Sequence, residues 1–260
     1  MLKYEIALSL ARRCGYSSYF EICTPTTGRT FAQVDKGHFT RRVRLMYRCP
    51  PDFSDGESID YSTAAESSEE AFSELLRTGE RFDLVFVDPW HTYASSQRDL
   101  IFGLQLVNRD GIVMVHDCNP PNLDCADPEF HPGEWCGVTF AAFLDLVLFA
   151  EDLHYATVDC DYGCGIISRQ PQLASLLRTG PNSELTSRWR VLDLKNKYSF
   201  FDEHRSELLR LTSTEEFCLR LAEGSQCGQE VLKGALQMTG SATSVPSSST
   251  APEAIESLPW

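Results

Sequence analysis

The sequence predicts an α/β protein with a doubly wound, mostly parallel β-sheet. Short apolar segments that suit buried strands alternate with segments in which apolar residues recur at helical spacing. Repetition of strand, helix and strand favours a parallel sheet with helices on both faces. Two adjacent strands, Phe82–Asp88 and Gly111–Asp117, end in polar residues. We therefore expect the working site at the ends of these two strands.

Length and composition indicate one main domain. The chain has 260 residues, of which 42% are hydrophobic and 11% aromatic, which is enough for one sizeable core. It contains no apolar run of roughly 18 residues, and its first residues mix acidic and basic side chains. We expect a cytoplasmic protein that does not contact a membrane.

Charge and cysteine usage exclude further classes of protein. A formal net charge of -14 argues against a nucleic-acid partner, because phosphate binding needs Lys and Arg. A small molecule or a protein is the expected partner. The ten cysteines are scattered through predicted strands and helices, and we expect reduced thiols. Cys160 and Cys164 lack a second pair at zinc-finger distance, which disfavours a zinc site.

The first half of the chain alternates helix and strand up to the turn at Gly79. Turn-rich residues Thr24–Gly28 follow the first strand, and Ser67–Glu70 resemble a helix start with acidic residues in its first turn. In order, we expect a helix over 2–14, a strand at Tyr19–Cys23, a helix over 29–35, strands at Val43–Tyr47 and Ser58–Tyr61, and a helix from 67 to about 79.

The second half contains the clearest strands. Phe82–Val87 is apolar and β-branched, and Pro89 ends it because proline restricts the preceding residue. Asp110 and Gly111 turn the chain into a second central strand. The expected elements are strands at 82–87 and 112–115, a helix between them that ends near 107, a helix over 138–149, and strands at 155–158 and 165–168.

We expect three regions along the chain. Residues 1–170 form the sheet domain, and residues 171–239 form a helical C-terminal extension or cap with helices over 171–179 and 203–222. The aromatic residues of 189–201 suit packing on the sheet domain or a homodimer interface. Residues 240–260 are rich in Ser, Thr, Pro and Ala and cannot bury enough apolar surface to become ordered.

Polar residues follow each strand at the edge where open α/β sheets bind ligands. Neighbouring strands lie about 4.8 Å apart, so Asp88 and Asp117 can converge on one ion or hydroxyl group. His91 and His116 would lie beside them. Each residue also has a structural alternative, since both acids can fix turns and a histidine can be a hydrogen-bonded core residue.

Three segments of the sequence together resemble a known family. The segments YFEICTPTTGRTF, FDLVFVDPWHTYASSQRDL and GIVMVHDCNPP together resemble the class I S-adenosylmethionine-dependent methyltransferases. The branch it resembles has Asp-x-x-His-x-Tyr after the fourth strand and His-Asp after the fifth. The resemblance covers roughly residues 17 to 169 and implies a seven-stranded, Rossmann-like sheet.

The resemblance also implies a cofactor site for S-adenosylmethionine. In this family the acid and the glycines of the first strand and turn hold the methionine part of the cofactor, because small residues let the backbone approach it. Two departures concern Cys23, which stands where the first glycine is usual, and the second strand, which ends without a ribose-binding acid. The residues carried over to the cofactor site are Glu21, Ile22, Cys23, Thr24, Gly28 and Asp88.

The implied reaction is O-methylation of a small-molecule hydroxyl, such as that of a sugar, a phenol or a natural product. The catalytic candidates are His91, His116 and Asp117, with one of the two histidines as the base, because its ordinary pKa is near neutral. Asp88 and Asp117 would bind Mg²⁺ as a second cofactor. The acceptor pocket would come from loops, here 120–137 and 171–235.

Two other classes of function remain open. The chain could be a non-catalytic Rossmann-like partner protein, which Cys23 and the stiff Thr-Pro-Thr-Thr turn favour. It could also be a metal-dependent hydrolase or a sugar-modifying enzyme of similar topology, which the acids and histidines at the strand ends would serve.

Overall fold

The structure is a computed structural model in which residues 1–27, 30–34, 37–170, 173, 176–177 and 183–223 are described. Gly28, most of the predicted helix over 171–179 and the tail 240–260 lie outside the described residues. The predictions made for them are not addressed by the structure.

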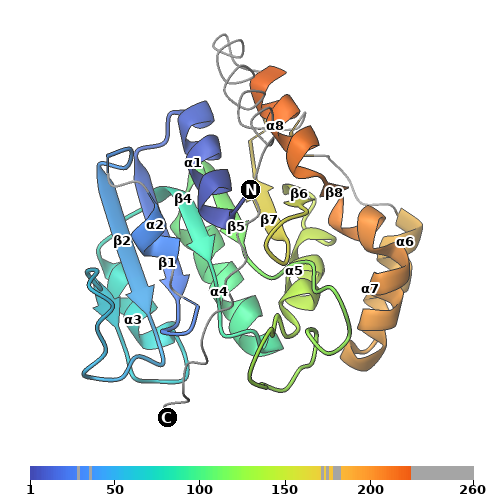
Figure 1. Cartoon of the computed structure of the whole chain (residues 1–260), viewed down its shortest axis with the longest axis horizontal. Helices are drawn as coiled ribbons and strands as arrows, with labels where there is room; N and C mark the ends of the chain where they lie inside the picture. Colours follow the sequence, from blue (N-terminus) through green and yellow to red (C-terminus); the bar gives the residue numbers. More distant parts are fainter. Residues whose placement is uncertain (28–29, 35–36, 171–172, 174–175, 178–182, 224–260) are drawn as a thin grey trace, which may run out of the picture.

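The described chain forms one eight-stranded sheet with the order β3-β2-β1-β4-β5-β7-β6-β8 (Figure 1). The pairs β1 with β2, β1 with β4, β4 with β5, β2 with β3 and β6 with β8 are parallel, whereas β7 runs antiparallel to β5 and β6. The strands are β1 (Ser18–Cys23), β2 (Arg41–Met46), β3 (Tyr61–Ser62), β4 (Phe82–Val87), β5 (Val107–Val115), β6 (His154–Val158), β7 (Cys164–Ser168) and β8 (Leu211–Thr212).

The predicted doubly wound, mostly parallel sheet is therefore confirmed. The sequence predicted seven strands, and the short β8 adds an eighth beside β6. The order reverses between β1 and β4, which places the carboxyl ends of these strands at the topological switch point where open α/β sheets bind ligands.

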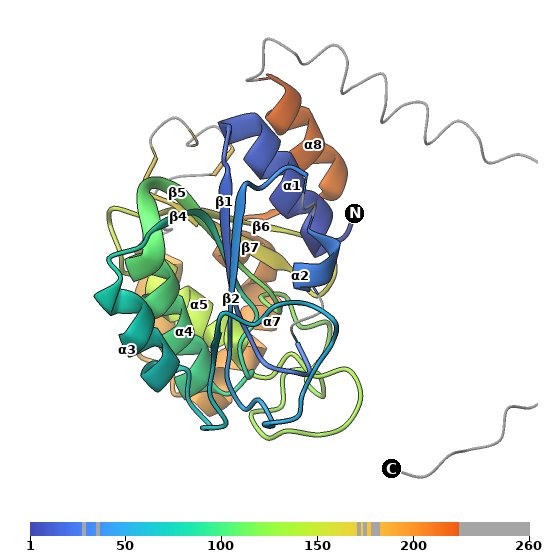
Figure 2. The ribbon, with the colours of Figure 1, turned by 90° about the vertical axis from the view of Figure 1, so that its left-hand side faces the viewer.

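Helices cover both faces of the sheet (Figure 2). One face carries α1, α2 and α8, and the other carries α3, α4, α5, α6 and α7. The helices are α1 (Lys3–Cys14), α2 (Thr30–Gln33), α3 (Glu69–Arg77), α4 (Tyr93–Leu106), α5 (Thr139–Val147), α6 (Ser183–Arg190), α7 (Leu194–Leu209) and α8 (Thr214–Glu223).

Alternation along the strands builds the two cores. In β1, Phe20 and Ile22 pack toward α3, α4 and α5, while Tyr19 packs toward α1 and α2. The same alternation buries every residue of β4 except Asp83, and it buries the last part of β5, Gly111–Val115. Each fully buried Val, Leu, Ile, Phe or Met side chain stabilises the fold by about 1.5–3 kcal/mol. The strands whose ends form the site are thus held by the densest part of the core.

The C-terminal helices differ from the prediction in two respects. The expected helix over 203–222 is broken, because Arg210 adopts a left-handed conformation with φ of 51° and the chain then forms β8 before α8 begins. The aromatic residues of 189–201 are largely buried within the chain itself: Trp189 and Phe201 are fully buried. They therefore do not provide the exposed surface from which a homodimer was expected, and no finding tests the dimer itself.

A half-buried carboxylate holds α6 and α7 against the sheet domain. Asp145 of α5 accepts hydrogen bonds from Tyr93 Oη at 2.6 Å, Trp189 Nε1 at 2.6 Å and Lys197 Nζ at 2.5 Å. These donors come from α4, α6 and α7 respectively. The described part of the C-terminal region is thereby fixed on the face that carries α5.

The structure bears on the expectations about membrane contact and about the cysteines. None of the helices in the described part of the chain has the length and apolar character needed to cross a lipid bilayer. The cysteines among the described residues are all free thiols, as expected for reduced side chains.

Candidate active site

The ends of β4 and β5 bring Asp88, His116 and Asp117 together. Val87 pairs with Val115 in parallel register, and the backbone N–H of His116 donates to the Val87 carbonyl at 3.0 Å. His116 Nδ1 consequently lies 3.5 Å from Asp88 Oδ1 and 3.0 Å from Asp117 Oδ2. The convergence expected from strand spacing is present, and all three side chains are buried.

His91 joins this group from the loop between β4 and α4. Its Nδ1 lies 2.7 Å from the carbonyl oxygen of Trp135. A carbonyl oxygen only accepts hydrogen bonds, so Nδ1 carries a proton and donates. The other ring nitrogen, Nε2, then points toward the acids, 2.9 Å from Asp117 Oδ2 and 3.7 Å from Asp88 Oδ1.

The loop that holds His91 approaches its backbone very closely. The N–H of Val138 donates to the His91 carbonyl at 2.9 Å, and Gly137 precedes it with φ of 54°. A Cβ atom on Gly137 would lie 2.2 Å from the same carbonyl oxygen. Only glycine fits at this position, and it lets one loop fix both the ring and the backbone of His91.

Asp117 is held in a conformation that is uncommon for a side chain other than glycine. Its φ is 60°, which places it in the left-handed region. The next two residues are pinned to the β6–β7 turn, because the N–H groups of Cys118 and Asn119 donate to the carbonyls of Gly163 at 3.1 Å and Tyr162 at 2.7 Å. Backbone strain of this kind is frequent at functional sites, where the surrounding structure maintains it.

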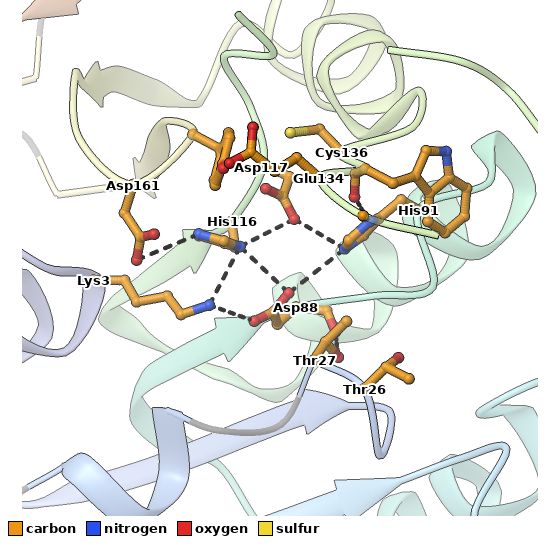
Figure 3. A pocket seen from close by; sticks show the side chains of 13 residues that line it. Lys3, Thr26, Thr27, Asp88, His91, His116, Asp117, Glu134, Cys136 and Asp161 are labelled. Carbon is orange, nitrogen blue, oxygen red and sulfur yellow. Dashed lines mark hydrogen bonds and ion pairs between the residues drawn. The ribbon is translucent and has the colours of Figure 1, made fainter. Parts of the chain in front are cut away.

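Two residues of the site were missed by the sequence analysis. Lys3, the first residue of α1, places Nζ 3.0 Å from Asp88 Oδ2 and 3.4 Å from His116 Nδ1. Asp161 lies in the β6–β7 turn, with Oδ2 at 3.6 Å from His116 Nε2. Figure 3 shows both side chains directed at His116 from the side opposite His91.

Each of these residues left a weak signal in the sequence. A lysine at the first position of a helix is unfavourable for the helix dipole, which suggests that it has another role. Asp161 follows β6, which runs in the same direction as β5 because both are antiparallel to β7. An acid after such a strand lies at the same edge as Asp88 and Asp117.

The cluster strongly shifts the ionisation of its members. Burial alone would raise the pKa of Asp88, but the charges of Lys3 and His116 hold it well below its usual range. Burial would lower the pKa of His91, but Asp117 and Asp88 outweigh it and raise the pKa to about 9. The pKa of His116 is raised against burial in the same way by Asp117 and Asp88. The site therefore stabilises positive charge.

These residues line a pocket of about 400 Å³ (Figure 3). Acidic side chains predominate in its wall, with Lys3 as the one lysine among the residues that line it. No residue of 183–223 contributes to the lining. The pocket is lined by Lys3, Thr26, Thr27, Asp88, His91, His116, Asp117, Gly133, Glu134, Trp135, Cys136, Asp161 and Tyr162.

The predicted cofactor residues of β1 and of the start of its turn lie beneath the wall of the pocket and do not line it. Glu21, Ile22, Cys23 and Thr24 are all fully buried, and none of the four lines the pocket. The Glu21 carboxyl accepts a hydrogen bond from Tyr19 Oη at 2.6 Å, and burial raises its pKa to about 7. The turn reaches the pocket through Thr26 and Thr27, whose Oγ1 donates to the Asp88 carbonyl at 2.7 Å.

The end of β2 is occupied by residues that interact with the β4–α4 loop. The guanidinium of Arg48 lies over the Trp90 ring, 4.1 Å from its centroid. The N–H of Trp90 donates to Tyr47 Oη at 2.6 Å. Asp52, the acid nearest to this strand end in the sequence, is exposed. No acid from this strand end approaches the pocket among the described residues.

Asp88, His116 and Asp117 also form a candidate metal site. Each offers one ligand atom, and these atoms lie within 4.8 Å of one another. The predicted pair Asp88 and Asp117 is thus accompanied by His116. Carboxylate oxygens with one imidazole nitrogen suit a divalent cation of the Mg²⁺ to Mn²⁺ type or a first-row transition metal.

Comparison with known proteins relates part of the chain to a family. Residues 6–118 match the family model described as a methyltransferase domain, which spans β1, β4 and both polar strand ends. This match covers less than half of the chain. The resemblance to class I methyltransferases is confirmed by this match and by the sheet, whereas the particular motif branch stays a prediction.

Solved structures similar to this chain share little sequence with it. An O-methyltransferase from Bacillus cereus in complex with SAH is 10% identical, with 64% of this chain and 79% of that chain covered and a TM-score of 0.47. TomG from Streptomyces achromogenes, an O-methyltransferase involved in tomaymycin synthesis, is 15% identical, with coverage of 64% and 78% and a TM-score of 0.41. No curated protein sequence matches the chain.

Proposed function

We propose that this methyltransferase uses S-adenosylmethionine to methylate the oxygen of a small-molecule hydroxyl group, with His91 as the general base. The observation that carries the proposal is the orientation of the His91 ring. Nδ1 donates to the Trp135 carbonyl at 2.7 Å, so that Nε2 faces the pocket and the acids. An imidazole with one nitrogen anchored and the other directed at a pocket is the arrangement expected of a base.

The second histidine is less suited to that role. Both nitrogens of His116 are surrounded by charged groups: Nδ1 by Asp88, Asp117 and Lys3, and Nε2 by Asp161. Among the described residues no backbone carbonyl anchors a ring nitrogen of His116 in the way that the Trp135 carbonyl anchors Nδ1 of His91. We therefore assign His116 to holding the acids in place and to binding a cation.

The pocket residues fit S-adenosylmethionine. When bound, the cofactor would supply a methyl group on a positively charged sulfur; the acceptor oxygen would bond to the methyl carbon in line as the neutral thioether leaves with the electron pair of the broken C–S bond. Asp88, Asp117, Glu134 and Asp161 line the pocket and favour a cationic ligand. Asp88 Oδ1 is buried without a hydrogen-bond partner among the described residues, which leaves an acceptor for a ligand donor at the pocket. Thr26 and Thr27 would contact the cofactor from the first turn.

The residues also fit a divalent cation. Such an ion acts as a Lewis acid that acidifies a hydroxyl group bound to it. Asp88, His116 and Asp117 would supply its protein ligands, and Asp88 Oδ1 and His116 Nε2 lack hydrogen-bond partners in the described structure. We include Mg²⁺ in the proposed function on this basis.

In this mechanism the residues of the chain align the acceptor and remove one proton. Against burial, the acids raise the pKa of His91 to about 9, so Nε2 would accept the proton of the acceptor hydroxyl when a cation bound to Asp88 and Asp117 offsets their charge and releases the proton on Nε2. The Trp135 carbonyl keeps the ring oriented through Nδ1. Asp117, 2.9 Å from Nε2, stabilises the imidazolium that results. The Trp135 ring, 5.0 Å from the His91 ring, limits access of water on one side.

The test begins with binding of S-adenosylmethionine and its demethylated product by isothermal titration calorimetry. Binding of both to the wild type is expected, and the absence of any binding at millimolar ligand would leave only a non-catalytic role. His91→Gln should bind the cofactor as the wild type does and lower kcat by about 10²–10⁴-fold with an accepted hydroxyl compound. His131→Gln, at a histidine outside the pocket, is the matched control and should retain activity.

A further inference from the structure

Lys3 already occupies part of the space where a cation would bind. Its ammonium lies 3.0 Å from Asp88 Oδ2 and 3.4 Å from His116 Nδ1. These two residues belong to the candidate cation site of Asp88, His116 and Asp117. Figure 3 shows the lysine side chain reaching both of them from α1. The candidate ligand set is therefore partly satisfied by a cation of the chain itself.

A lysine ammonium and a divalent cation are poorly compatible at this distance. A bound ion would lie about 2.0–2.6 Å from ligand atoms of the same two residues. That would place it within a few ångströms of the ammonium, in a site where Asp88 is 1% exposed and charge repulsion is weakly screened. The ammonium and the ion would therefore repel each other.

We propose that Lys3 and a divalent cation compete for Asp88 and His116, so that the first turn of α1 sets the affinity of the site for metal. The inference rests on the cation site in the proposed function and adds Lys3 to it as a positioning residue. With the lysine in place, the ammonium holds Asp88 toward His116. With metal bound, the lysine side chain withdraws from both.

The surroundings of Lys3 permit this exchange. Its side chain is 19% exposed, against 1% for Asp88, so the lysine is the partner of the pair with access to solvent. The lysine stem has four flexible carbons. Asp161, with a side chain 24% exposed, lies on the same side of His116 as Lys3 and offers the displaced ammonium another carboxylate (Figure 3).

Calorimetric titration of the whole chain with MnCl₂ alone tests the competition. Lys3→Met removes the ammonium and should bind Mn²⁺ at least about tenfold more tightly than the wild type. Lys3→Arg keeps a positive charge and should bind no more tightly than the wild type. Lys195→Met, which removes an exposed lysine of α7, is the control for net charge and should match the wild type.

A second substitution and a thermal melt keep the test decisive. Lys3→Gln retains a hydrogen-bond donor without the charge and should also bind Mn²⁺ more tightly, and both neutral variants should unfold cooperatively. Equal or weaker Mn²⁺ affinity in folded Lys3→Met overturns the competition, and so does the absence of binding in every variant. Loss of S-adenosylmethionine binding in the wild type would instead overturn the proposed function, which a separate titration without metal reports.

Discussion

Nδ1 of His91 donates a hydrogen bond to the Trp135 carbonyl at 2.7 Å, and this single contact determines which nitrogen faces the pocket. The residues lie 44 positions apart in the chain. The same loop supplies Gly137, whose missing side chain allows the backbone of His91 to approach. The orientation of the proposed base is thus a property of the loop over 133–138 as much as of the histidine.

Replacement of Gly137 by alanine should disturb this arrangement. The new Cβ would lie 2.2 Å from the His91 carbonyl oxygen, at a φ of 54° that alanine adopts poorly. We expect a loss of about 2–4 kcal/mol in the free energy of unfolding, measured by urea titration, together with loss of methyl transfer.

Gly133→Ala is the matched control for that experiment. Gly133 also has positive φ, at 108°, but a Cβ there would meet nothing within 4 Å. It should lose only about 1 kcal/mol from backbone strain. Equal losses in the two variants would show that the close approach to His91 is not what requires glycine at position 137.

Replacement of Asp117 should abolish activity while leaving the fold intact. Asparagine is the suitable substitute, because it tolerates the left-handed conformation that Asp117 adopts at φ of 60°. Without the carboxylate, the His91 imidazolium loses its partner at 2.9 Å. We expect kcat to fall by at least about 100-fold in Asp117→Asn. Normal turnover in folded protein would contradict the site, and Asp124→Asn at an exposed acid serves as the control.

The stability of the protein should depend on pH through His91. Its folded-state pKa of about 9 lies above the ordinary value of about 6.5, so the folded protein holds an extra proton between these values. The stabilisation is fully present below about pH 6.5 and is lost as the pH rises through about 9. With a chelator present, the wild type should lose on the order of 2 kcal/mol more than His91→Gln between pH 6 and 9.5.

Urea titrations at the two pH values measure this difference. The comparison with His91→Gln removes the contribution of other groups that titrate in the same window. Identical pH dependence in the two proteins would mean that His91 carries no extra proton in the folded state.

The raised pKa of Glu21 predicts a second dependence of stability on pH, in a lower pH range than that of His91. Burial raises its pKa to about 7, so the folded state binds more protons than the unfolded state between about pH 4.5 and 7. Stability from this group is present below about pH 4.5 and is lost as the pH rises to about 7. Glu21→Gln should therefore gain on the order of 2 kcal/mol relative to the wild type between pH 5 and 8, by urea unfolding. A constant difference would show that Glu21 is ionised throughout.

The sequence by itself determined the sheet and the centre of the site. Phe82–Val87 and Ile112–Val115 are recognisable because central parallel strands are buried on both faces and read as apolar runs. Neighbouring parallel strands end at one edge, so Asp88, His116 and Asp117 had to meet there. Local sequence was sufficient because both facts depend on residues within each strand and its immediate end.

Only the tertiary structure decided what surrounds that centre. Lys3 lies 85 positions before Asp88, and Arg210 breaks an apparently continuous helical pattern so that β8 can pair with β6. The orientation of His91 depends on Trp135, and the position of Asp117 depends on the turn that contains Asp161. These contacts join elements that are distant in the chain, and their geometry follows from packing of the whole sheet with its helices, which no local pattern encodes.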